Sequence, residues 1–147
     1  MTALDLTTRW PVEHVSAAVL RAGTVVATTG DLDRVQRLAS ISKPMTAWAT
    51  LVAVEEGIVE LDQSVGQPGC TVRHLLAHAG GYPFDGPDPI ARPEATRMYS
   101  NTGIELVADA VERASAMAFA DYLHEALFVP LDMHDTALRG SPAHGVH

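Results

Sequence analysis

The pattern of apolar and polar residues predicts strands at the beginning of the chain. Two short segments rich in apolar and β-branched residues, 15–20 and 24–26, lie on either side of Gly23 and predict an antiparallel hairpin. After a polar turn, residues 34–38 are expected to form a short third strand. We therefore expect the strands of this chain to lie within residues 1–40.

Helical spacing of apolar residues replaces this pattern in the rest of the chain. Residues 42–56 are predicted to form a helix, with Pro44 in its first turn and Gly57 directly after its end. Since almost every side chain from residue 45 to 54 is apolar, we expect this helix to be buried on most sides. Three more helices are expected, one at residues 71–78, one capped by Asn101 or Thr102, and one at residues 118–128.

The order of these elements defines the expected fold class. Residues 80–93 contain three glycines and four prolines and are expected to form a loop. Strands followed by a run of helices indicate an α+β protein, although two or three strands make a marginal sheet on their own. We expect residues 1–147 to belong to a single domain, with strands in residues 1–40 and mostly helices in residues 41–147.

The composition is that of an acidic globular protein, with 10 Lys and Arg against 18 Asp and Glu, and 47% apolar residues. Without a basic cluster the chain has no electrostatic footprint for nucleic acid or anionic lipid, so we expect neither partner. The longest apolar segment is far shorter than the roughly 20 residues of a membrane helix. Because Cys70 is the single cysteine and no segment resembles a signal peptide, we expect a cytoplasmic protein.

A hydroxyl and an amine lie three positions apart at the start of the predicted buried helix, in the S-x-x-K sequence Ser40-Ile41-Ser42-Lys43. Residues three apart share a helix face, so the Lys43 amine can reach the Ser40 hydroxyl. A lysine with a pKa of about 10.4 acts as a base near neutral pH only if burial or a positive neighbour lowers that pKa. The alternative is that Ser40 caps the helix and Lys43, the single lysine of the chain, is solvated.

A second candidate group, Tyr99-Ser100-Asn101, lies directly before a predicted helix. A phenol can transfer a proton, and a carboxamide can hold a substrate carbonyl or the lysine in place. The alternative is that Asn101 caps the helix while Tyr99 anchors a loop.

Two histidines four residues apart, His74 and His78, raise the question of a metal site. Leu75 stands where an H-E-x-x-H zinc motif needs its glutamate, so we favour a structural role for both histidines. We expect no metal and no cofactor.

Four segments together resemble the penicillin-recognising serine hydrolases of the class C β-lactamase and D-alanyl-D-alanine carboxypeptidase type. They are the S-x-x-K segment with Pro44, Thr46 and Ala47, the sequence Thr-Val-Arg-His-Leu-Leu-Ala-His at residues 71–78, the Y-x-N segment, and Pro-Leu-Asp-Met-His-Asp-Thr at residues 130–136. The resemblance implies a β-lactamase/transpeptidase-like fold, with an N-terminal hairpin of an antiparallel sheet and a mostly helical part.

The same resemblance implies roles for four residues. Ser40 would be the nucleophile that becomes acylated, Lys43 would activate it, and Tyr99 would share the proton transfers. Asn101 would position Lys43 or the substrate amide. Whether Lys43 or Tyr99 is the general base stays open.

We therefore expect a serine hydrolase that acts through an acyl-enzyme on a small-molecule amide or ester: a β-lactam, a D-alanyl peptide or a carboxylic ester. The lack of a signal peptide favours the ester. The alternative is a non-catalytic module that keeps the fold in order to bind a ligand or a partner.

The chain departs from the family pattern at the third motif, a Lys or His followed by a small residue and Gly. Residues 143–145, Ala-His-Gly, lie too near the end of the chain to fill this role. We expect the remaining strands, the third motif and the second oxyanion N–H to lie downstream. Residues 1–147 would then be the N-terminal part of a larger enzyme and would associate with the remainder of the same protein or with themselves.

Overall fold

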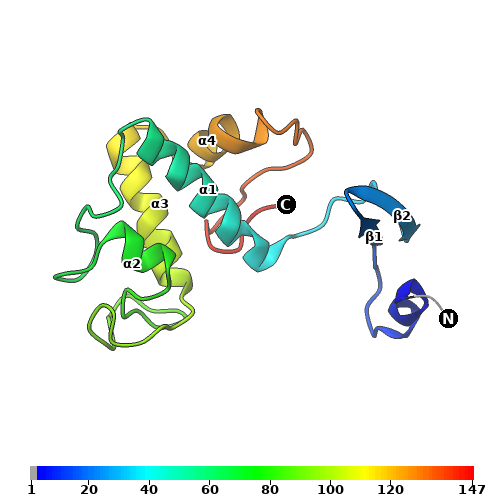
Figure 1. Ribbon diagram of the computed structural model, residues 1–147, viewed down its shortest axis with the longest axis horizontal. Coiled ribbons are helices and arrows are strands. Elements are labelled where there is room, and N and C mark those ends of the chain that lie inside the picture. The colour runs from blue at the N-terminus through cyan, green and yellow to red at the C-terminus, as the bar shows by residue number, and fades with distance from the viewer. Residues whose placement is uncertain (1–2) are drawn as a thin grey trace. The chain divides into compact units, whose positions relative to one another are not determined.

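The computed structural model describes residues 3–147, which divide between Gln36 and Arg37 into two units. The first unit holds a 3-10 helix at Ala3–Arg9 and the strands β1 (Ala17–Arg21) and β2 (Thr24–Thr29). The strands pair antiparallel, and Figure 1 shows them as one hairpin. The predicted hairpin is confirmed.

The hairpin has a tight turn and one irregularity in its strand pairing. Ala22 and Gly23 both have positive φ, 49° and 78°, as the tight turns that match the twist of paired strands require. A register shift between Val19 and Leu20 adds an irregularity to β1.

The expected third strand at residues 34–38 is wrong. No strand is assigned to these residues, and Leu38 donates a single backbone hydrogen bond to the carbonyl of Val146 (2.9 Å). A strand needs a ladder of such bonds with a neighbouring edge, and one bond does not make a ladder.

The second unit is helical. The helix α1 (Ser42–Glu55) packs against α3 (Asn101–Ser115), and α2 (Val72–Leu76) packs against the other side of α3. The short helix α4 (Phe119–Leu123) lies against α1 and α3, as Figure 1 shows. It continues into a π-helical turn at His124–Phe128. Residues 80–93 form the predicted loop.

The helix α1 begins after a 3-10 turn at Ala39–Ile41 and ends before Gly57, whose φ of 73° turns the chain. Its inner face presents small residues such as Ala49 and Ala53, both fully buried, which allow close packing. Trp48 and Leu51 on its outer face are about half exposed. The exposed residues of α1 share one narrow face, and the other positions from 42 to 54 are buried or half-buried. The expectation that α1 is buried on most sides is therefore confirmed.

Two apolar clusters flank α3. Its residues Ala108 and Val111 belong to the cluster shared with α1 and α4, and Val107 and Ala110 belong to the cluster shared with α2. The segment predicted as a helix at residues 118–128 adds four buried residues to the first of these clusters: Phe119, Tyr122, Leu123 and Leu127. The helix α3 is thus the element that joins both parts of the core.

Side chains cap the first turns of α2 and α3. Ser100, not Asn101 or Thr102, caps α3, since its Oγ accepts a hydrogen bond from the Gly103 N–H (2.9 Å). Thr71 caps α2 in a capping box in which His74 Nδ1 accepts from the Thr71 N–H (3.2 Å). Among the helices of residues 3–147, none has the length and apolar character needed to cross a membrane.

Leu123 offers a test of the packing around α3. It is fully buried, so Leu123→Ala is expected to lower the free energy of unfolding by about 2–5 kcal/mol through lost burial and a cavity. The matched control Leu131→Ala removes the same atoms from a half-exposed position and is expected to cost about 0.5 kcal/mol or less. Urea unfolding of both variants measures the difference, and equal losses would contradict the packing described here.

Candidate active site

Ser40 lies in the 3-10 turn before α1 and not in the helix itself. The preceding residue, Ala39, has a φ of 47°, a conformation that costs energy for a residue with a Cβ. Ser40 is exposed, and Ile41 rather than Ser40 occupies the cap position of α1, without a side-chain bond. The alternative in which Ser40 caps the helix is therefore wrong.

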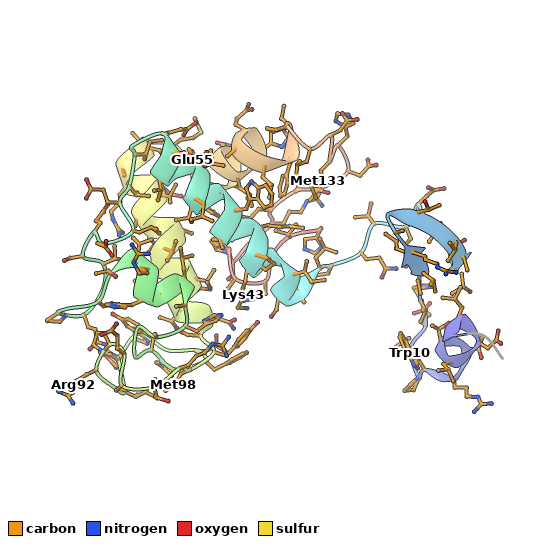
Figure 2. The ribbon with its side chains drawn as sticks, viewed as in Figure 1. Trp10, Lys43, Glu55, Arg92, Met98 and Met133 are labelled. Carbon is orange, nitrogen blue, oxygen red and sulfur yellow. The ribbon has the colours of Figure 1, made fainter. Side chains whose placement is uncertain are left out.

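Lys43 extends from the first turn of α1, where Figure 2 labels it, and is 5% exposed. Its Nζ donates to Ser40 Oγ over 3.0 Å, as the three-residue spacing predicts. It also donates to the backbone carbonyl of Ala143 over 2.9 Å, and it lies 4.8 Å from the centre of the Tyr99 ring. The buried amine thus has a partner on each of three chain segments.

The segment that carries Ala143 lies along the first turns of α1. The carbonyl of Pro142 accepts from Thr46 Oγ1 (2.8 Å), and the Val146 N–H donates to Ser42 Oγ (3.0 Å). Sequence reasoning missed this partner of Lys43 because a backbone carbonyl is common to all residue types and leaves no motif.

Tyr99 is 42% exposed, and its phenol lies close to Ser40 and Lys43. The bond with the Ser40 hydroxyl lowers the pKa of Tyr99 most, and the bond to Lys43 and its positive charge lower it further, against a smaller opposing effect of burial. The phenol of Tyr99 therefore ionises at a lower pH than that of an ordinary tyrosine.

A cleft of about 240 Å³ opens beside these three side chains. Its lining is Ser40, Lys43, Pro44, Ala47, Leu76, His78, Tyr99 and Ile104. The structure therefore brings three of the four predicted site residues together around one hollow, with apolar groups on the remaining walls. A hydroxyl with an amine and a phenol beside it in such a hollow can perform nucleophilic catalysis.

Asn101, the fourth predicted residue, does not line this cleft. Its Nδ2 donates to Asp85 Oδ1 in the loop at 2.9 Å, and within the described residues its buried Oδ1 has no hydrogen-bond partner. The role expected for Asn101 in holding Lys43 or a substrate amide stays a prediction. Asp85, its observed partner, gave no signal in the sequence.

The two histidines considered as metal ligands hold backbone groups instead. His74 closes the cap of α2 and lies 3.2 Å from the carboxylate of Glu94, while His78 Nδ1 accepts from the Ser100 N–H (3.2 Å). Over residues 3–147 the structure has no group of three or more His, Cys, Asp or Glu side chains that could hold a metal ion.

The chain belongs to the β-lactamase family, whose model matches residues 10–145. A solved β-lactamase from Mycobacterium bovis is 47% identical, with a TM-score of 0.91 over 99% of this chain and 54% of that one. The resemblance to penicillin-recognising enzymes and the β-lactamase/transpeptidase-like fold are confirmed.

Two curated relatives are more distant. Penicillin-binding protein 4* of Bacillus subtilis (strain 168) is 33% identical over 132 residues, which are 67% of this chain and 29% of that protein. The D-alanyl-D-alanine-carboxypeptidase/endopeptidase AmpH of Escherichia coli (strain K12) is 26% identical over 76% of this chain and 38% of its own. The chain thus spans less than half the length of these curated relatives.

The shifted pKa of Tyr99 can be tested against the other tyrosines. Burial and the hydrogen bond to Glu56 (2.6 Å) raise the pKa of Tyr122, so Tyr99 is expected to ionise at lower pH than Tyr122. An alkaline titration of protein labelled with ¹³C at tyrosine Cζ follows each phenol by NMR. Tyr99→Phe and Tyr122→Phe assign the two resonances, and Ser40→Ala is expected to move the Tyr99 transition to higher pH. An unmoved transition would contradict the bond to Ser40.

Proposed function

We propose that the protein is a serine hydrolase that cleaves an amide or ester through an acyl-enzyme on Ser40. The observation that carries the proposal is the 3.0 Å contact between Lys43 Nζ and Ser40 Oγ, two residues that line the cleft. The contact gives an exposed hydroxyl an adjacent buried amine, which is the arrangement that activates a weak nucleophile.

The carbonyl of Ala143 orients this amine. A carbonyl oxygen can only accept, so one N–H of Lys43 points toward Ala143. In the neutral amine the lone pair is then free to face Ser40 Oγ. Arginine could not replace it, because a guanidinium stays protonated.

The reaction proceeds in two halves. Ser40 Oγ attacks the substrate carbonyl carbon, its proton passes to Lys43 or to the Tyr99 phenolate, and the carbonyl electron pair moves to oxygen. When the carbonyl re-forms, the bond to the leaving amine or alcohol breaks and that group takes up the proton. Water then attacks the acyl-serine in the same way, which releases the acid and restores Ser40. Either base fits this scheme.

The substrate class rests on both the cleft and the relatives. The apolar walls at Pro44, Leu76 and Ile104 suit an uncharged group beside the scissile bond. The relatives named for penicillin binding and for D-alanyl-D-alanine cleavage support an amide, either a β-lactam or a D-alanyl peptide, and a carboxylic ester reacts by the same steps.

A fluorophosphonate probe separates catalysis from mere binding. The protein is expected to gain one covalent adduct by intact-mass spectrometry, and peptide mapping is expected to place it on Ser40. Ser40→Ala is expected to abolish labelling, while the control Ser64→Ala, at an exposed serine outside the cleft, leaves it unchanged. Absence of an adduct would favour a binding module, and an adduct on Ser42 or Ser100 would overturn the assignment.

The need for a base is tested by Lys43→Arg. This change keeps the positive charge but is expected to lower kcat/KM by about 10²–10⁴-fold, since a positioned base contributes that much. Tyr99→Phe is expected to cost less. The control Arg113→Lys exchanges the same two residue types at an exposed position on α3 and leaves the rate unchanged. A near-normal rate for Lys43→Arg would exclude Lys43 as the base.

A further inference from the structure

His78 contacts three successive residues of the segment that carries Tyr99. Its carbonyl oxygen accepts from the Met98 N–H (2.8 Å), and its Nδ1 accepts from the Ser100 N–H (3.2 Å). Between these two bonds the imidazole and the Tyr99 ring lie 4.7 Å apart, centre to centre, with their planes tilted by 37°. The backbone carbonyl and the imidazole of His78 thus contact Met98 and Ser100, the residues on either side of Tyr99, as well as the Tyr99 ring.

The backbone of His78 is turned to make this possible. Its φ of 58° is left-handed, a conformation in which histidine and asparagine are found more often than most residues with a side chain. The ring lines the cleft together with Ser40, Lys43 and Tyr99. The second imidazole of the pair, His74, makes no such contact with this segment, because it is engaged with Thr71 and Glu94.

The hydrogen bond to Ser100 defines the protonation state of the ring. Because Nδ1 accepts from an N–H, it carries no proton, and the neutral ring has its proton on Nε2. A proton on Nδ1 would set two donors against each other and break the contact.

Burial and two charged neighbours also favour the neutral ring of His78. Partial burial, Arg97 in the Tyr99 segment and Lys43 on α1 all lower the pKa of His78 below its ordinary value of 6.5. Near neutral pH the ring is therefore in the form that the Ser100 bond requires, and the bond is lost as the pH falls through this lowered value.

We infer that His78 is the positioning residue for Tyr99, and that it holds the phenol beside Ser40 and Lys43 only while its imidazole is neutral. The inference rests on the proposed function insofar as Tyr99 takes part in catalysis. His78 itself transfers no proton to the substrate. Its effect reaches the reaction through the place of the Tyr99 ring, where a displacement of about 1 Å can cost about 10²-fold in rate.

The structural half of this inference can be tested without any activity. In protein labelled with ¹³C at tyrosine Cζ and histidine Cε1, the Tyr99 resonance is expected to shift between pH 5 and 8 with the same midpoint as His78, below 6.5. In His78→Asn, which offers an oxygen acceptor and tolerates a positive φ, that shift is expected to disappear. A Tyr99 resonance that ignores the titration of His78 would overturn the inference, whether or not Ser40 reacts.

The catalytic half uses two substitutions and a double-mutant cycle. His78→Phe keeps a ring but loses the acceptor, and it is expected to slow acylation of Ser40 by a fluorophosphonate about 10–100-fold. His78→Asn is expected to recover about tenfold of that loss. In a Tyr99→Phe background, His78→Phe is expected to add little, because both changes remove the same function.

Multiplicative losses in the double variant, or no recovery in His78→Asn, would mean that His78 does not act through Tyr99 and would overturn the inference. Failure of the unsubstituted protein to react with the probe would instead overturn the proposed function. The titration of the Tyr99 resonance would then still decide whether His78 positions Tyr99.

Discussion

The geometry of the site depends on the burial of one amine. An amine as enclosed as that of Lys43 must find hydrogen-bond partners inside the protein, because its loss of water is costly. It finds them on Ser40, three residues away, and on Ala143, 100 residues away in the sequence. The need of the amine for hydrogen-bond partners therefore joins the beginning of α1 to residue 143 and places the amine against the Ser40 hydroxyl.

The helix α3 supports the opposite side of the cleft. Its buried residues belong to both apolar clusters, so its position is set by α1 and α4 on one side and by α2 on the other. Ser100 caps its first turn and also donates to the carbonyl of Pro83 in the loop (2.6 Å). Because Tyr99 directly precedes this cap, the packing of the core determines where the phenol lies.

The sequence predicted the parts of the site that depend on local spacing. The hairpin, α1 and the approach of Lys43 to Ser40 follow from residues a few positions apart, whose geometry helices and turns dictate. The cap at Ser100 was misplaced by one residue, since serine and asparagine at neighbouring positions are equally suitable caps. The third strand at residues 34–38 failed because a strand requires a partner whose position no local pattern contains. The contacts of His78 and Ala143 likewise depend on chain segments far apart in the sequence.

The bond between Lys43 and the carbonyl of Ala143 has a consequence for sequence change. Every amino acid has the same carbonyl, so a mutation at position 143 leaves this acceptor in place provided that the path of the chain is kept. What limits position 143 is volume, because Ala143 is fully buried and a larger side chain would have to displace its neighbours. One hydrogen bond of the site therefore depends on the path of the backbone and not on a side chain. It can persist through substitutions that would remove a bond made by a side chain.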